Sequence, residues 1–458
     1  MSHSPAPAPA ASASPDRAAL FHTADGQNVV VTFILISSLF LLWGFLNGMI
    51  DVMDKHFQQE LHLSLAQSAW VQFAHYLGYF LMALPAGWLA LRLGYKGGII
   101  AGLLMVAAGG LWFIPATQIA QFWAFLLGVC FIAAGLTFLE TIANPYATVL
   151  GAPRYAAMRI NLAQSCNGIG WIFGPIAGGM FFYGKDANGI SHGSQTLWIP
   201  YAAVAVIVLV LAVVFYFARI PDLKAPDVYA DDESQPNRSL WHHPHFVFAV
   251  AAQFFYVAAQ AGIFSFFINY MTSETPPIPA EWQTGVLAGW FEIKGAGAVV
   301  LSDQGAAYLA SLGFFCFLAG RFIGSLLLGV FPAHRVLALY GVLNAAACLL
   351  VVLKLGWLSV VCVFAGYFFM SIMFPTIFAL GIHGLGTRAK HASSFIVMAI
   401  MGGAVLPKFM GAVGDRYGVA RSFLVPLACF LIVALYGFSW RRLSRTGAVT
   451  SVKLSKVH

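Results

Sequence analysis

Charged residues are scarce in this chain of 458 residues. Asp, Glu, Lys and Arg together make up 9% of it, whereas hydrophobic residues make up 60% and the mean hydropathy is +0.80. Soluble globular proteins contain about 25% charged and about 45–50% apolar residues, so no water-soluble core can hide this much apolar surface. The composition excludes a soluble enzyme, a secreted domain and a protein that binds nucleic acid. It indicates an integral membrane protein, in which the net charge of +7 sets orientation.

Cysteine is also rare, and a signal peptide is missing. The six cysteines are scattered singly through apolar stretches without metal-site spacing, so we expect small buried side chains, no metal and no cofactor. Residues 1–28 are rich in Ala, Pro and Ser and lack the apolar core of a signal peptide. This pattern is typical of a disordered cytoplasmic tail.

Long apolar runs, in contrast, are abundant. A helical span needs about 20 apolar residues, and the period-two alternation of a membrane β-barrel is absent from the sequence. We therefore expect an all-α membrane protein with twelve transmembrane helices. The runs cover residues 29–55, 66–91, 97–116, 120–147, 158–183, 196–219, 244–271, 304–330, 334–353, 356–382, 391–413 and 421–440.

The distribution of Lys and Arg predicts the orientation. With the N-terminus inside, sixteen of these residues fall in loops and tails on that side and six on the other. Because cytoplasmic loops carry the excess of positive charge, we expect both termini in the cytoplasm and the helices in a bacterial inner membrane.

Two polar breaks divide the chain further. Residues 220–243 form a cytoplasmic linker between an N-terminal six-helix half, 29–219, and a C-terminal half, 244–440, which is followed by a cytoplasmic tail, 441–458. The second break, 272–302, is mildly amphipathic and is a candidate for a short interfacial helix on the outer side.

Glycine and proline positions indicate that the halves are repeats. Pro145 and Pro375 each precede a glycine by six residues, and Pro175 and Pro407 each follow a glycine by five. Parallel six-helix repeats of this kind are the architecture of major facilitator transporters, which bind substrate near the midplane between the halves.

Two glycine-rich strings are candidate gates. GWLALRLGYK, on the cytoplasmic side, contains Arg92 and Lys96 but has Leu91 where a facilitator signature has an aspartate. It is either a latch between helices or an ordinary basic loop. GAVGDRYG, on the outer side, keeps its acid as Asp415.

Ionisable residues within the apolar runs are the sharpest functional signals. A charge at the bilayer centre costs roughly 2.5–3.5 kcal/mol, so Asp51, Glu140 and Arg321 each require a reason. Lys408 lies near a helix end, from which its side chain can reach the interface. His75 is more typical of a packed core histidine.

Polar residues at helical spacing accompany these charges. Residues three or four apart share one face of a helix, and such faces line either a cavity or a contact between helices. Amide and carboxylate groups suit sugar hydroxyls, although hydrogen bonds between helices are the alternative. The candidates for substrate binding are Asn47, Asp51, Gln164, Asn167, Gln253, Tyr256 and Gln260.

Several strings carry a family resemblance. FLLWGFLNGMIDVMDKHFQ (39–58), GLTFLETIANPYATVLG (135–151), INLAQSCNGIGWIFGP (160–175), SIMFPTIFALG (371–381) and SSFIVMAIMGGAVLPKFMG (393–411) resemble the fucose–galactose–glucose:proton symporter family of the major facilitator superfamily, and within it the L-fucose permease branch.

The resemblance implies twelve helices, a rocker-switch and proton-coupled sugar uptake. It places a sugar-binding role on Asp51, protonation and sugar binding on Glu140, and sugar contacts on Gln164 and Asn167. Gly48 and Ile50 depart from the L-fucose branch, which has asparagines there, so the sugar remains open at this point.

We therefore expect a monomeric transporter, not an enzyme, whose partners are a sugar, protons and the lipid bilayer. L-fucose is the first candidate; glucose or galactose, N-acetylglucosamine, or uncoupled facilitated transport are the alternatives. Glu140 and Asp51 are the candidate proton-coupling groups, and Arg321 is their candidate charge partner. Counting along the helices predicts that Asp51 and Glu140 lie at different depths and are not bonded to each other.

Overall fold

The computed structural model describes residues 21, 28–151, 156–183, 198–220, 240–278, 290–294, 298–383, 385 and 389–454. Most of the predicted N-terminal tail, most of the 220–243 linker and the last four residues lie outside this set.

The N-terminal half consists of α-helices. Its elements are α1 (Val30–Asp51), α2 (Met53–Glu60), α3 (Leu65–Ser68), α4 (Trp70–Ile119), α5 (Phe122–Val149), α6 (Ala156–Phe182) and α7 (Trp198–Phe217). The long α4 contains two predicted spans, and Gly94 separates them with φ 70° and ψ 179°. Only glycine adopts this backbone conformation without strain, so Gly94 makes the turn between the two spans.

The C-terminal half has the same character. Its elements are the 3₁₀ helix η4 (Leu240–His242), α8 (Pro244–Ser265), α9 (Phe267–Glu274), the strands β1 (Phe291–Lys294) and β2 (Ala298–Leu301), α10 (Asp303–Val330), α11 (Ala333–Val352), α12 (Trp357–Met370), α13 (Met373–Ile382), α14 (Ala389–Met398), η8 (Ala399–Met401), α15 (Gly402–Tyr417), α16 (Val419–Ser422) and α17 (Leu424–Leu454).

The structure adds detail to two segments of the predicted organisation. In the 272–302 segment, the strands β1 and β2 pair antiparallel, with Phe291 opposite Leu301 and Lys294 opposite Ala298; residues 279–289, where the candidate interfacial helix would fit, lie outside the described residues. The β-branched pair Val299–Val300 favours extended structure there. In addition, α17 continues through the predicted tail to Leu454, because no proline follows residue 440.

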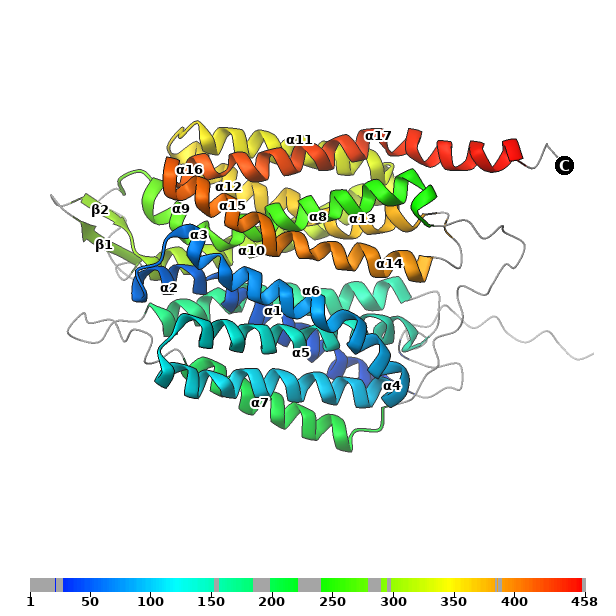
Figure 1. The fold of residues 1–458 in the computed structure, drawn as a ribbon, viewed down its shortest axis with the longest axis horizontal. Helices are drawn as coiled ribbons and strands as arrows, with labels where there is room; N and C mark the ends of the chain where they lie inside the picture. Colours follow the sequence, from blue (N-terminus) through cyan, green and yellow to red (C-terminus); the bar gives the residue numbers. More distant parts are fainter. Residues whose placement is uncertain are drawn as a thin grey trace, which may run out of the picture.

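The helices run side by side along one direction (Figure 1). Helices α1 and α4–α7 form one group and α8–α17 the other. We call the end that carries α2, α3, α9, α16 and the hairpin the hairpin end, and the end at which α17 terminates the terminal end. Within the first group, Gly44 and Gly170 let α1 and α6 approach so closely that a Cβ at either residue would overlap the backbone of the other helix.

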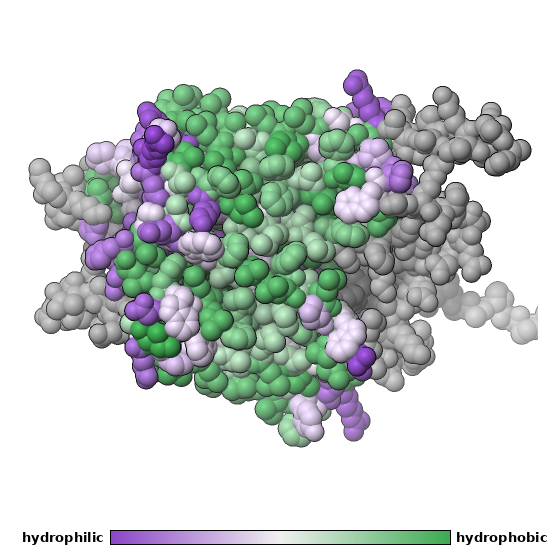
Figure 2. Space-filling view, in the orientation of Figure 1, coloured by the Kyte–Doolittle hydropathy of each residue, from purple (hydrophilic) through white to green (hydrophobic). Residues whose placement is uncertain are grey.

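The outer surface fits a bilayer. Figure 2 shows an apolar band across the middle of the face in view, with hydrophilic residues towards both ends. Large apolar side chains are open to the surroundings; Leu326 on α10, for example, is 75% exposed. Ten described helical segments are long and apolar enough to cross a membrane. The first part of α4 and the amide-bearing α6 complete the twelve-helix arrangement.

Candidate functional site

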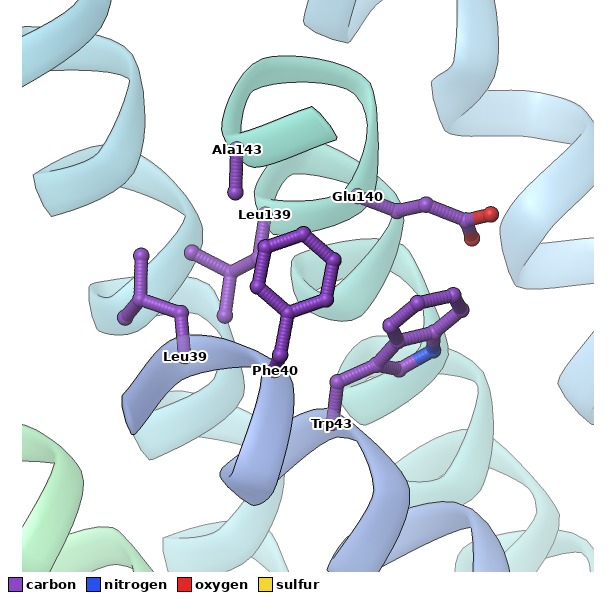
Figure 3. A pocket seen from close by; sticks show the side chains of 6 residues that line it. All are labelled: Leu39, Phe40, Trp43, Leu139, Glu140 and Ala143. Atoms are coloured by element: carbon purple, nitrogen blue, oxygen red, sulfur yellow. The ribbon is translucent and has the colours of Figure 1, made fainter. Parts of the chain in front are cut away.

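Glu140 lies on α5 beside an aromatic wall from α1. A small cavity is lined by Leu39, Phe40, Trp43, Leu139, Glu140 and Ala143. In Figure 3 the apolar members pack together, while the Glu140 side chain extends past the Trp43 indole with its carboxyl group directed away from them. Among the described residues, Glu140 has neither a hydrogen bond nor an ion pair. Its carboxylate is therefore available to a ligand or a proton.

Tyr79 connects this wall to the predicted site. The indole nitrogen of Trp43 donates to the Tyr79 hydroxyl at 2.6 Å, and Asn47 lies near the same phenol. The neighbouring Tyr76 lies within electrostatic range of both Asp51 and Glu140. The two predicted carboxylates therefore belong to one region, and no hydrogen bond joins them.

Asp51 has a partner that sequence reasoning missed. The Gln72 side-chain amide on α4 donates both to Asp51 Oδ1 and to Asp54 Oδ2, at 3.3 Å each. Asp54 is 0% exposed, and Ser265 of the C-terminal half donates to its Oδ2. The spacing of three residues between the aspartates is the only sequence signal, because Asp54 lies at the end of an apolar run, where charge is ordinary.

The α6 amides form contacts between helices in this structure. The Gln164 amide donates to Asn144 Oδ1 on α5 at 3.1 Å. The Asn167 amide donates to the Phe40 backbone oxygen on α1 at 3.2 Å. These bonds match the alternative weighed for the amides, and their role in sugar binding stays a prediction.

The C-terminal half contributes polar groups that lack partners. Gln253 is 0% exposed, and in the described part of the chain neither its amide nitrogen nor its amide oxygen has a hydrogen bond. Tyr256, one turn along α8, donates to the Met370 backbone oxygen at 2.9 Å, and Gln260 is half-buried on the same helix. Buried polar groups are nearly always paired, so Gln253 requires an explanation.

Arg321 lies on α10 and lacks the expected partner. Its guanidinium carbon lies 5.2 Å from the centre of the Phe317 ring, and its Nε is buried without a hydrogen bond. Tyr256 is within its electrostatic range. Among the described residues no ion pair joins Arg321 to Glu140, so the anticipated charge pair is not formed in this arrangement of the helices.

An aromatic cluster spans the boundary between the halves. The Trp171 ring on α6 lies 4.7 Å from Phe314 and 5.6 Å from Phe264. Tyr367 stacks on Phe264 at 4.6 Å, and its buried hydroxyl has no partner. Rings of this kind present apolar faces on which the C–H groups of a sugar can pack.

Polar contacts between the halves gather at the hairpin end. Asp415 accepts from the backbone N–H groups of Leu65 and Ala66, at 2.7 and 3.0 Å. Further contacts across the boundary join Gln58 to Asn269, Lys55 to Asp303 (3.9 Å), Gln59 to Asp303, and Lys408 to the Trp70 ring (3.8 Å). This end of the boundary is closed.

The candidate gate string at the terminal end, GWLALRLGYK, makes contacts of a different kind from those of Asp415. Arg92 lies over the Trp88 ring at 4.1 Å, and Lys96 donates to the Ala218 backbone oxygen at 3.0 Å. Both partners belong to the N-terminal half. The contacts seen for Arg92 and Lys96 therefore lie within one half, whereas those of Asp415 cross the boundary.

Two six-helix groups with buried polar and aromatic side chains between them define a secondary transporter. The chain belongs to the Major Facilitator Superfamily, whose family model matches residues 29–407.

Relatives of known name support this membership. The chain is 34% identical to the L-fucose-proton symporter of Escherichia coli (strain K12) over 435 residues, which cover 90% of this chain and 93% of the relative. It is 31% identical to a glucose/galactose transporter of Brucella abortus, with 91% and 95% covered. Among solved structures, the transporter FucP in the outward conformation matches with a TM-score of 0.64 at 33% identity, over 90% of this chain and 99% of that one.

Proposed function

We propose that this protein takes up a monosaccharide together with protons across the bacterial inner membrane, as a monomer, by alternating access. L-fucose is the first candidate, since the E. coli relative is an L-fucose-proton symporter. Glucose and galactose are the alternative that the Brucella relative suggests, and N-acetylglucosamine is a further one.

One observation carries the proposal of a polyhydroxylated substrate. Buried polar atoms of Gln253, Tyr367 and Asp51 have no hydrogen-bond partner, and aromatic rings lie between the halves that bear them. A buried polar group without a partner costs about 1–3 kcal/mol. A ligand rich in hydroxyl groups removes this cost, because each hydroxyl both donates and accepts.

The closed hairpin end supports an inward-facing state. Helix α17 ends at the other end of the helix bundle (Figure 1), and α1, which leads into α2 at the hairpin end, begins on that side. The positive-inside bias of the sequence favours a cytoplasmic location for that end. The hairpin end then faces outward, and its cross-boundary contacts shut the outer path. The FucP structure named above is in the outward conformation, so it represents a different step of the proposed cycle.

Coupling to protons is assigned to Glu140. Its carboxyl group has no partner among the described residues and lies beside the Trp43 wall, where removal of water favours the neutral, protonated form. Loading of a proton from the outside would therefore assist closure around the sugar. An uncoupled facilitator would not need a carboxyl group that gains and loses a proton.

Uptake into proteoliposomes tests the proposal. The purified protein should accumulate labelled L-fucose above equilibrium when the lumen is more alkaline than the bath, and only equilibrate without the gradient. Unlabelled L-fucose, D-glucose, D-galactose and N-acetylglucosamine, added in competition, would rank the substrates. Equal uptake with and without a gradient would indicate a facilitator, and no uptake of any of these sugars would refute the proposal.

A further inference from the structure

The Asp51–Asp54 pair stands apart from the other polar groups of the boundary. Both carboxyl groups share one Gln72 amide, and Asp54 is further bonded to Ser265 of the opposite half. We call the cross-boundary contacts that close the hairpin end the outer gate. Asp54 is therefore part of the outer gate, whereas Glu140 lies beside Trp43 on α1. A charge on Asp54 has consequences for closure that a charge on Glu140 does not have.

The pair lacks enough donors for two negative charges. Asp51 Oδ2 and Asp54 Oδ1 are buried and accept no hydrogen bond from any described residue. Lys55, the cation nearest in sequence, instead pairs with Asp303. Among the described residues, no ion pair reaches either carboxyl group. Two adjacent carboxylates without a cation are strongly disfavoured away from water, because burial and mutual repulsion act in the same direction.

The surrounding titratable groups do not relieve this excess. Tyr183, after α6, donates its hydroxyl to the Val52 backbone oxygen. His56 on α2 packs against Phe182. The remaining titratable groups around the pair are His75 and Tyr76 on α4 and Tyr367 on α12, and the Lys55–Asp303 pair lies at the rim. None of them donates a hydrogen bond to the pair.

We propose that the Asp51–Asp54 pair binds one proton when the outer gate closes, and that this proton locks the gate by removing the charge repulsion that opposes closure, while Ser265 donates to Asp54 across the boundary. On closure, one carboxylate takes a proton from the outer solution and becomes an O–H donor between the aspartates. On opening, Ser265 leaves, water enters, the O–H bond breaks and the proton returns to the solution. The lock rests on the proposed alternating access and is distinct from coupling at Glu140.

The test follows the outer gate itself, without sugar and without a proton gradient. Spin labels replace Gln121 and Tyr417, two exposed hairpin-end residues in opposite halves, in a full-length chain whose native cysteines are changed to serine. The distance distribution in nanodiscs gives the closed-to-open ratio from pH 5 to 9. If closure takes up one proton, this ratio should fall by up to about tenfold per pH unit through the transition.

Variants identify the group responsible. Asp54→Asn should keep the gate closed and change the ratio by less than about threefold over the whole range, because no proton is then required. Asp303→Asn, a matched loss of one carboxylate at the accessible rim of the same gate, should alter the ratio but keep its pH dependence. Ser265→Ala should favour the open gate at every pH with the same slope.

The outcomes separate this inference from the proposed function. The inference would be overturned if the closed-to-open ratio of Asp54→Asn kept the wild-type dependence on pH. It would also be overturned if Glu140→Gln lost this pH dependence while Asp54→Asn kept it. Infrared spectra of the unmutated chain provide a second measurement: closure at low pH should add the carbonyl band of a protonated carboxyl group, and its absence would also overturn the lock. A pH-dependent gate in a protein that takes up no sugar would refute only the proposed function.

Discussion

The carboxylate of Asp415, on α15, accepts a hydrogen bond of 2.7 Å from the backbone N–H of Leu65, at the start of α3. Its second oxygen accepts from the backbone N–H of Ala66 at 3.0 Å. One side chain of the C-terminal half therefore binds the first turn of a helix in the N-terminal half. Gly411 lies where any Cβ would meet the backbone of Ala66. This close approach and the two hydrogen bonds explain how a short helix can be part of a gate.

Asp415→Ala should loosen the hairpin end. Both hydrogen bonds are lost, and the two backbone N–H groups bind water instead. At this exposed position the loss should destabilise the closed gate by about 1 kcal/mol, which lowers the closed-to-open ratio roughly fivefold. The spin-label distance between positions 121 and 417 measures the shift. Arg416→Gln is the control. The contact seen for Arg416 is with its neighbour Tyr417, which the label replaces, so this variant removes no contact described across the boundary and should leave the ratio unchanged. An unchanged ratio in Asp415→Ala would contradict a gating role.

Glu140→Gln should separate exchange from accumulation. The amide occupies the same space beside Trp43 but cannot gain or lose a proton, so the variant should bind sugar and exchange labelled for unlabelled sugar at a measurable rate. Uptake driven by a pH gradient should fall to the equilibrium level. Exchange and gradient-driven uptake, measured in the same proteoliposomes, check this. Full accumulation by the variant would show that the coupling proton resides elsewhere.

Much of the fold can be predicted from the sequence because it depends on local properties. The length of each apolar run fixes a span, and Gly94 interrupts α4 where the spacing of the runs requires a turn. The hairpin at 291–301 escapes prediction because its strands are four residues long each and their pattern competes with that of an interfacial helix.

The site is less predictable, because its contacts depend on packing and on the state of the carrier. Asp51 and Glu140 are recognisable, since a carboxylate within an apolar run is rare. The hydrogen bonds from Gln72 to Asp51 and Asp54 form only when α4 packs beside the end of α1. Whether Arg321 meets a carboxylate depends on the conformation, and no local pattern encodes a conformational equilibrium.

Gln253→Leu should stabilise the protein while weakening sugar binding. The substitution removes two buried polar atoms without partners and keeps most of the volume, so the sugar-free protein should gain about 1–3 kcal/mol. Loss of the amide should lower sugar affinity by about tenfold or more. Thermal unfolding with and without sugar, together with calorimetry, measures both effects.

Gln164→Leu is the matched control for Gln253. It removes the hydrogen bond to Asn144 and should destabilise the protein, because the side-chain oxygen of Asn144 then loses this donor. A stability gain in Gln253→Leu with unchanged sugar affinity would exclude Gln253 from the binding site.

Arg321→Ala should slow turnover more than it weakens equilibrium binding. With the hairpin end closed, the guanidinium lies over Phe317 and its Nε has no partner. A buried cation without a carboxylate is costly, so we expect another step of the cycle to supply one. Glu140 is the candidate, after its proton has left for the cytoplasm and before the empty carrier turns outward.

This assignment predicts which transport modes fail. Net uptake by Arg321→Ala should fall by about tenfold or more, while the dissociation constant of the sugar changes by less than about threefold. Exchange should be spared, because it does not require return of the empty carrier. Arg321→Lys keeps the charge and should recover part of the net uptake. Initial-rate uptake, exchange and calorimetry on the same preparations decide the matter: if affinity collapses while turnover per bound sugar stays normal, Arg321 is a sugar ligand and not the partner of Glu140.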